Sequence, residues 1–482
     1  MISGSLLIAI VLAYFAVLML VARFTKGAQN NSAFFNANKS APWYLVAFGM
    51  IGASLSGVTF ISVPGWVEAS QFSYFQMVLG YILGYLVIGR VLLPIYYHYN
   101  LTSIYTYLST RFGHYTYKTG ASFFILSRIV GASFRLYLVA SVLQWVIFDQ
   151  MGVPFWFTVI VTVCFIWLYT HRSGINTIVW TDVLQTGFML LALCLGLYYV
   201  SASLEIENIG LWLREQQTTQ IFFFDDYKSP YYFWKQFFAG TLIAVVMTGL
   251  DQDMMQKNLS CRSLKDAQKN MFWFTIVLTL VNFVFLCLGA LLTAYAFTNG
   301  IDAHKDQLFP IVATQGGFGI TLALVFLLGL IAAAYSSADS ALTSLTTSVS
   351  IDLLEIEKKL PKAQQEQTRK RVHLLVSGVL IAVILGFNYL IADESVIAKL
   401  FVFAGYTYGP LLALYALGIG SKIQLKDKWV PWVAVLTPVL GYLISQWTNK
   451  YYGFDFGFFV LALNGTLGMI GLWLIRRKQI TT

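Results

Sequence analysis

The sequence predicts an all-α protein that crosses a membrane many times. Of its 482 residues, 58% are hydrophobic, 16% are aromatic and 11% are charged, whereas soluble domains carry about 25% charged residues. Apolar runs recur from residue 4 to residue 475, and most basic residues lie between them. This composition excludes an ordinary water-soluble enzyme. The net charge of +9 is spread over loops, so we expect no nucleic-acid partner.

Thirteen runs are apolar and long enough to cross the hydrocarbon core as helices, which takes roughly 20 residues. Polar segments or breaks containing glycine and proline separate them. The predicted spans cover residues 4–22, 42–67, 73–98, 119–148, 153–170, 174–202, 229–254, 270–298, 318–352, 373–392, 395–421, 429–447 and 457–475.

The basic residues predict which side of the membrane each loop faces. An odd number of crossings separates the termini, and cytoplasmic loops retain the excess of lysine and arginine. With the N-terminus outside, the inside segments hold 22 of the 31 basic residues, including those of segments 257–269 and 476–478. Arg23 and Lys26 follow the first span and no basic residue precedes it, which indicates an uncleaved anchor. We expect an N-terminus outside and a C-terminus inside the plasma (inner) membrane.

The reactive side chains do not suggest an enzyme. Cys164, Cys194, Cys261 and Cys287 are scattered without metal-type spacing, so we expect neither a disulfide framework nor a metal centre. The five histidines lie at or near span ends, and no extramembrane segment is large enough for a catalytic domain. We expect no organic cofactor.

Two spans contain clusters that interrupt a helix. One cluster, rich in glycine and serine, covers residues 49–59, and the other covers residues 248–253. Unwound backbone in a bilayer must be enclosed by protein, so the clusters indicate a cavity, although small residues also serve close helix packing. Each cluster lies in the first span of a set of five, spans two to six and spans seven to eleven. Because five is an odd number of crossings, the second set starts from the opposite side of the membrane and is inverted relative to the first. The arrangement therefore predicts inverted repeats with a site at mid-membrane.

Matching interruptions in two repeats favour a carrier over a channel or a membrane enzyme. The sequence leaves the oligomeric state open. The predicted organisation is an extra helix and inside loop (1–41), a first five-helix repeat (42–202), an outside loop (203–228), a second five-helix repeat (229–421), and two C-terminal helices with an inside tail (422–482).

A polar stripe runs through the ninth span. Ala333, Ser336, Ser337 and Ser340 recur at helical spacings of three and four, with Asp339 beside them. An acid at mid-membrane costs about 2.5–3.5 kcal/mol on insertion scales, so it should face the interior and find a partner. Hydroxyl oxygens suit an alkali cation. A proton would need only the acid, and the hydroxyls can also serve as packing contacts.

Three further charged side chains stand out within spans. Asp182 lies about two turns above the inner surface and fits an ion path, or an ion pair with a basic residue of a neighbouring helix. Arg128 and Arg135 are seven residues apart, nearly on one helix face. A guanidinium can hold a carboxylate through paired hydrogen bonds, which favours a carboxylate-bearing solute. Either arginine can instead neutralise Asp182, Asp251 or Asp339.

Together these motifs resemble the sodium/solute symporter family over about residues 40–421. The resemblance rests on Ser54-Leu55-Ser56-Gly57 to Pro64-Gly65, Trp180-Thr181-Asp182, residues 252–256, the polar stripe of the ninth span, and Tyr408-Gly409-Pro410-Leu411-Leu412. It implies a LeuT-like fold of five plus five helices. The implied main sodium site consists of Gly52, Leu55, Ala333, Ser336 and Ser337. An implied second site consists of Asp182, Ser336, Asp339 and Ser340, and two acids there leave open whether one or two sodium ions bind.

The resemblance implies a sodium-driven importer that works by alternating access. Its expected partners are sodium, a small organic solute and the lipid bilayer. A carboxylate-bearing solute such as sialic acid or a monocarboxylate is favoured, and a carrier of a neutral sugar or vitamin, or a proton-coupled carrier, are the alternatives. Solute is expected beside the interrupted helices, where the candidate contacts are Ser54, Ser56, Thr59, Gln76, Arg128, Arg135, Thr248, Asp251 and Gln252.

Overall fold

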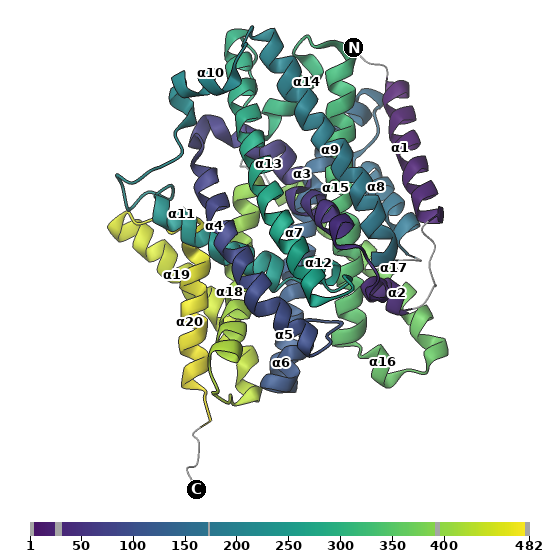
Figure 1. Ribbon diagram of the computed structural model, residues 1–482, viewed down its shortest axis with the longest axis vertical. Helices are drawn as coiled ribbons and strands as arrows, with labels where there is room; N and C mark the ends of the chain where they lie inside the picture. The colour runs from purple at the N-terminus through teal and green to yellow at the C-terminus, as the bar shows by residue number, and fades with distance from the viewer. Residues whose placement is uncertain (1–3, 25–30, 172–173, 391–395, 478–482) are drawn as a thin grey trace.

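The computed structural model describes residues 4–24, 31–171, 174–390 and 396–477, and within these ranges it contains helices and no β-strand (Figure 1). In the part of the chain that the structure describes, ten helices are long and apolar enough to cross a membrane, and a bent pair makes an eleventh. Two shorter apolar helices match the first and fifth predicted spans. The predicted total of thirteen crossings is reached only if both of these shorter helices also cross the membrane. Lys26, Arg172 and Lys478, which belong to the predicted inside charge, lie outside the described residues.

The helices follow the predicted spans closely, with short helices in the loops. The bundle helices are α1 (Gly4–Phe24), α3 (Trp43–Ser70), α4 (Ser73–Val87) with α5 (Leu93–His98), α7 (His114–Leu143), α8 (Phe155–Thr170), α9 (Ile175–Ser203), α11 (Phe233–Ala244), α12 (Gln252–Asn258), α13 (Leu264–Thr298), α15 (Gly319–Ser348), α17 (Lys362–Leu390), α18 (Val396–Gly420), α19 (Val430–Tyr452) and α20 (Val460–Leu474). The short helices are α2 (Asn31–Asn36), α6 (Thr106–Arg111), α10 (Ile209–Glu215), α14 (Leu308–Gln315) and α16 (Ile356–Lys359).

The two ends of the bundle differ in what they carry. In Figure 1, α10 and α14 lie at the upper end, whereas α2, α6 and α16 lie toward the lower end. The helix α1 begins near the upper end and α20 ends at the lower end, so the first and last described helices start and finish on opposite sides.

Two helices are interrupted, and both interruptions fall in the clusters noted in the sequence. Within α3, Ser56 has φ 51° and ψ 171°, which lies outside the helical region. The second helix runs from Phe233 to Gly249 and resumes as α12 at an angle of 68°. The helix α3 packs against α9, α13 and α15, so its break is enclosed by protein, as a bilayer requires.

The helices α4 and α11 cross at a pair of glycines. A Cβ atom at Gly80 would lie 2.0 Å from the Phe237 carbonyl oxygen, and one at Gly240 would lie 2.0 Å from the Met77 carbonyl oxygen. Each glycine therefore admits the backbone of the facing helix. This close approach fixes α11 beside α4 and so positions the bend that follows α11.

The crossing predicts that Gly240→Ala destabilises the protein by about 1–3 kcal/mol, because the added methyl group meets rigid backbone. The matched control is Gly386→Ala in α17, where a Cβ atom would meet nothing within 4 Å. Thermal unfolding of the purified variants measures the difference. Equal melting temperatures for the two variants would contradict the close crossing.

Candidate functional site

The first half of α3 ends at the candidate site. It stops at Leu55, before the non-helical Ser56. The last four carbonyl groups of a helix have no partner within the helix, so the carbonyl oxygens of residues 52–55 are candidates for binding other groups. The polar stripe of α15 packs against this part of α3, and Ala333, Ser336 and Ser337 are buried.

Gly52 allows α3 to approach hydroxyl groups of α9 and α15. A Cβ atom at Gly52 would lie 2.3 Å from Thr186 Oγ1 and 3.4 Å from Ser336 Oγ. The Thr186 hydroxyl is buried and has no hydrogen-bond partner among the described residues. Carbonyl and hydroxyl oxygens suit a hard monovalent cation, so this arrangement fits sodium. Thr186 was not predicted from the sequence to be a sodium ligand, although it lies one helical turn after Asp182.

Asp182 is held in a buried ion pair. Its Oδ2 atom lies 2.6 Å from Lys257 Nζ, and its Oδ1 atom accepts a hydrogen bond of 2.6 Å from Ser336 Oγ. Lys257 was predicted from the sequence to lie in an inside loop, and this prediction is wrong. The bend before α12 turns residues 252–258 into the bundle, where all of them are buried.

Asp339 is paired with hydroxyl groups. Its Oδ2 atom accepts a hydrogen bond of 2.9 Å from the Tyr169 hydroxyl, and its Oδ1 atom accepts one of 3.2 Å from Ser340 Oγ. The ion pairs found among the described residues include none to Asp339. Tyr169 of α8 was not singled out from the sequence, because nothing in a run of apolar residues marks which buried side chain meets an acid of another helix.

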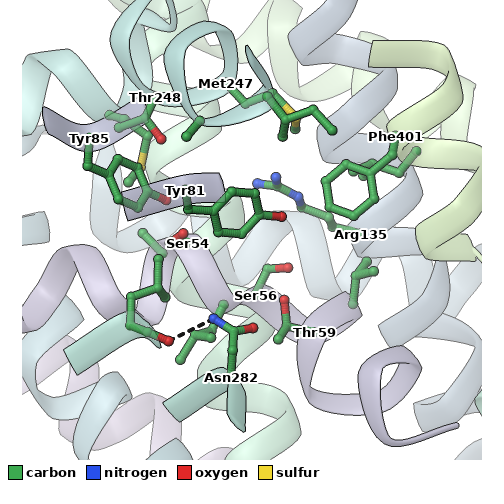
Figure 2. Close-up of a pocket in the computed structure, with 18 of the residues that line it drawn as sticks. Ser54, Ser56, Thr59, Tyr81, Tyr85, Arg135, Met247, Thr248, Asn282 and Phe401 are labelled. Carbon is green, nitrogen blue, oxygen red and sulfur yellow. Dashed lines mark hydrogen bonds between the residues drawn. The ribbon is translucent and has the colours of Figure 1, made fainter. Parts of the chain in front are cut away.

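A cavity lies between the two interrupted helices. Figure 2 shows the Arg135 guanidinium beside the Phe401 ring, with Tyr81 close to it. Ser54, Ser56 and Thr59 come from α3, and Met247 and Thr248 come from the end of the α11 segment. The lining residues are Ala53, Ser54, Leu55, Ser56, Val58, Thr59, Tyr74, Tyr81, Tyr85, Arg128, Arg135, Ile243, Ala244, Met247, Thr248, Met254, Leu278, Asn282, Leu400 and Phe401.

Six of the nine residues expected to contact solute line this cavity, and three do not. Those in the lining are Ser54, Ser56, Thr59, Arg128, Arg135 and Thr248. Gln76 instead binds the backbone of Tyr231 and Phe223 in the loop before α11. Gln252 binds the backbone of Thr102 and Ile104 before α6. Asp251 caps α12 through the Asp253 amide and faces Arg128.

The aromatic lining was missed from the sequence. Tyr74, Tyr81 and Tyr85 all come from α4 at spacings of seven and four, which places them on one helix face. Tyr74 and Tyr81 also share a hydrogen bond of 3.4 Å between their hydroxyl groups. The spacing of these three tyrosines is the sequence pattern from which an aromatic lining could have been predicted.

The two arginines of α7 have different surroundings. Arg128 Nη1 lies 3.7 Å from Asp251 Oδ2, and the same guanidinium is paired with Asp253. Arg135 Nη1 donates a hydrogen bond of 3.1 Å to Ser337 Oγ, and the ion pairs of the described residues do not include it. Its Nε atom is buried without a partner. Arg128 therefore neutralises acids of the protein, whereas Arg135 remains able to bind an anion.

A helical bundle with a cavity at two interrupted helices has the architecture of a secondary transporter. The chain belongs to the sodium:solute symporter family, whose model matches residues 34–420. It is therefore an integral, multi-pass membrane protein that couples solute transport to sodium, rather than an enzyme.

Two relatives and one solved structure illustrate the similarity. The sodium/sialic acid symporter SiaT of Proteus mirabilis is 23% identical, over 96% of this chain and 92% of that protein. Sodium-coupled monocarboxylate transporter 1 of Mus musculus is 25% identical, over 88% of this chain and 69% of that protein. The substrate-bound, outward-open structure of a Na⁺-coupled sialic acid symporter matches with a TM-score of 0.80 and 19% identity, over 97% of this chain and 96% of that one.

The different surroundings of the arginines predict different effects on stability. Arg128→Gln leaves two buried acids without their cation, and we expect a loss of roughly 3–5 kcal/mol. Arg135→Gln breaks no ion pair of the described residues, so we expect a loss of about 1 kcal/mol or less. Thermal unfolding of the solute-free protein compares them. A larger loss for Arg135→Gln would reverse the assignment of their roles.

Proposed function

We propose that the chain imports a carboxylate-bearing organic solute together with sodium, through the cavity between the interrupted helices. The observation that supports the solute class is Arg135, which faces the cavity and forms no ion pair among the described residues. A solute carboxylate would supply the missing charge and paired hydrogen bonds. Two of the relatives are named for sialic acid and monocarboxylates, which are solutes of this chemistry.

We propose a main sodium site made from the freed carbonyl groups of α3 and the hydroxyl groups of α15, with Thr186 as an additional ligand. The close approach of Gly52 to Thr186 and Ser336 supports it. The ligands are then Gly52, Leu55, Thr186, Ala333, Ser336 and Ser337. The second site expected at Asp182, Asp339 and Ser340 has less support, because Lys257 already pairs with Asp182.

We propose thirteen crossings, arranged as two inverted, LeuT-like repeats over residues 42–202 and 229–421. The matching breaks in α3 and after α11 support this arrangement. The excess of basic residues supports a cytoplasmic C-terminus and an external N-terminus in the plasma membrane. Segments 1–41, 203–228 and 422–482 are then accessory to the repeats.

In the proposed cycle, sodium and solute bind from outside, the repeats rock about the site, and both leave inward. Ser337 connects the two ligands, because its hydroxyl group is a proposed sodium ligand and accepts a hydrogen bond from Arg135. Sodium at Ser337 would hold that hydroxyl group, and through it the guanidinium that binds the solute. Such coupling is reciprocal, so solute must also raise the affinity for sodium.

Uptake into proteoliposomes tests the solute class. We expect sialic acid or a short monocarboxylate to accumulate under an inward sodium gradient, and not when potassium replaces sodium. Arg135→Gln should weaken binding of that solute by roughly 10- to 150-fold, which corresponds to about 1.5–3 kcal/mol for hydrogen bonds to a charged group.

The control variant is Lys265→Gln, which removes the positive charge of an exposed lysine in α13, away from the cavity. Accumulation of hexoses or pantothenate, with an equal loss for acidic and neutral solutes in Arg135→Gln, would refute the carboxylate assignment. Uptake that follows a pH gradient and ignores sodium would refute the sodium site.

Ser337→Ala tests the main sodium site. Loss of one hydroxyl ligand, worth about 1 kcal/mol, should raise the half-saturating sodium concentration roughly five-fold. Because Ser337 also contacts Arg135, sodium binding is measured calorimetrically without solute. Ser344→Ala is the matched control, since the Ser344 hydroxyl binds a backbone carbonyl within α15. Unchanged sodium affinity in Ser337→Ala would exclude Ser337 as a ligand.

A further inference from the structure

The ion pair between Lys257 and Asp182 lies directly beside the proposed sodium ligands. Ser336 belongs to both groups, because its hydroxyl group donates to Asp182 Oδ1 and faces Gly52. The side chains of Lys257 and Asp182 are 2% and 1% exposed. A lysine ammonium therefore occupies the position beside Asp182 where a second sodium ion would otherwise neutralise the acid.

Both carboxylate oxygens of Asp182 already have a partner. Oδ2 lies 2.6 Å from the Lys257 ammonium, and Oδ1 accepts a hydrogen bond of 2.6 Å from Ser336 Oγ. A second cation at Asp182 would be placed against the ammonium in a region without exposed protein surface, where like charges repel strongly. The close pairing thus opposes sodium at this acid.

The charges of the cluster also favour a single ion. The charges of Asp182 and Lys257 cancel within their ion pair, so this acid carries no net charge for a second sodium ion to balance. The nearby Arg135, which contacts Ser337, is balanced by the carboxylate of the solute under the proposed function.

We infer that Lys257 is a resident cation that replaces a second sodium ion at Asp182, so that the carrier binds one sodium ion. The inference rests on the proposed sodium site. Lys257 acts through Asp182, as a residue that sets the number of ions rather than as a ligand. Removing its charge opens a second cation site at Asp182.

Calorimetric titration of the purified, solute-free protein with sodium counts the bound ions. We expect one ion for the wild type, two for Lys257→Met and one for Lys257→Arg. The double variant Asp182→Asn/Lys257→Met removes both charges together and should bind one ion with an affinity within about three-fold of the wild type. Lys265→Met, at an exposed position of α13, is the control for removal of a lysine.

Because Lys257→Met leaves a buried acid unpaired and can fail to fold, the wild type and the double variant suffice for the test. Two ions in the wild type, one ion in folded Lys257→Met, or loss of sodium binding in the double variant would each overturn the inference. A wild type that binds no sodium would instead overturn the proposed sodium site, so the two failures are distinguishable.

Discussion

A peptide group inside a bilayer has no water to bind, and the arrangement of this protein depends on that constraint. The break at Ser56 frees carbonyl groups, and the bend after Gly249 does the same in the second helix. Such backbone is stable only where other helices enclose it and supply polar partners. The helices around α3 meet this need, and the hydroxyl groups and charges that converge there are the basis of the proposed binding site.

The bend before α12 also determines how the buried charges are distributed. It brings Asp251 and Asp253 to Arg128, and Lys257 to Asp182. The ion pairs to Arg128 of α7 and to Asp182 of α9 thus depend on the position of α12, a short helix of seven residues, and of Asp251, which caps it. Arg135, farther along α7, forms no ion pair with these acids among the described residues, and it lines the cavity. A movement of α12 relative to α7 and α9 would change all three ion pairs at once, which connects this helix to the proposed cation and solute regions.

Much of this could be predicted from the sequence, and the failures have a common cause. Hydropathy located the long apolar helices, and clusters of glycine and polar residues located both breaks, because these signals are local. Spacing placed Arg128 and Arg135 on one face, but it could not distinguish them, since the acids that pair with Arg128 come from α12. Lys257 was assigned to a loop because a polar segment after a span carries no sign of its 68° turn into the bundle. The sequence could not reveal ion-pair partners that come from segments far apart along the chain.

If Lys257 holds the carrier to one sodium ion as inferred, this would have an energetic consequence for the cell. A carrier that loads one sodium ion with a singly charged anion moves no net charge, so the membrane voltage does no work on the cycle. The solute gradient can then equal the sodium gradient at equilibrium and not exceed it. Such a carrier concentrates its solute less than a two-sodium carrier would, but it consumes fewer ions and continues to work when the membrane is depolarised.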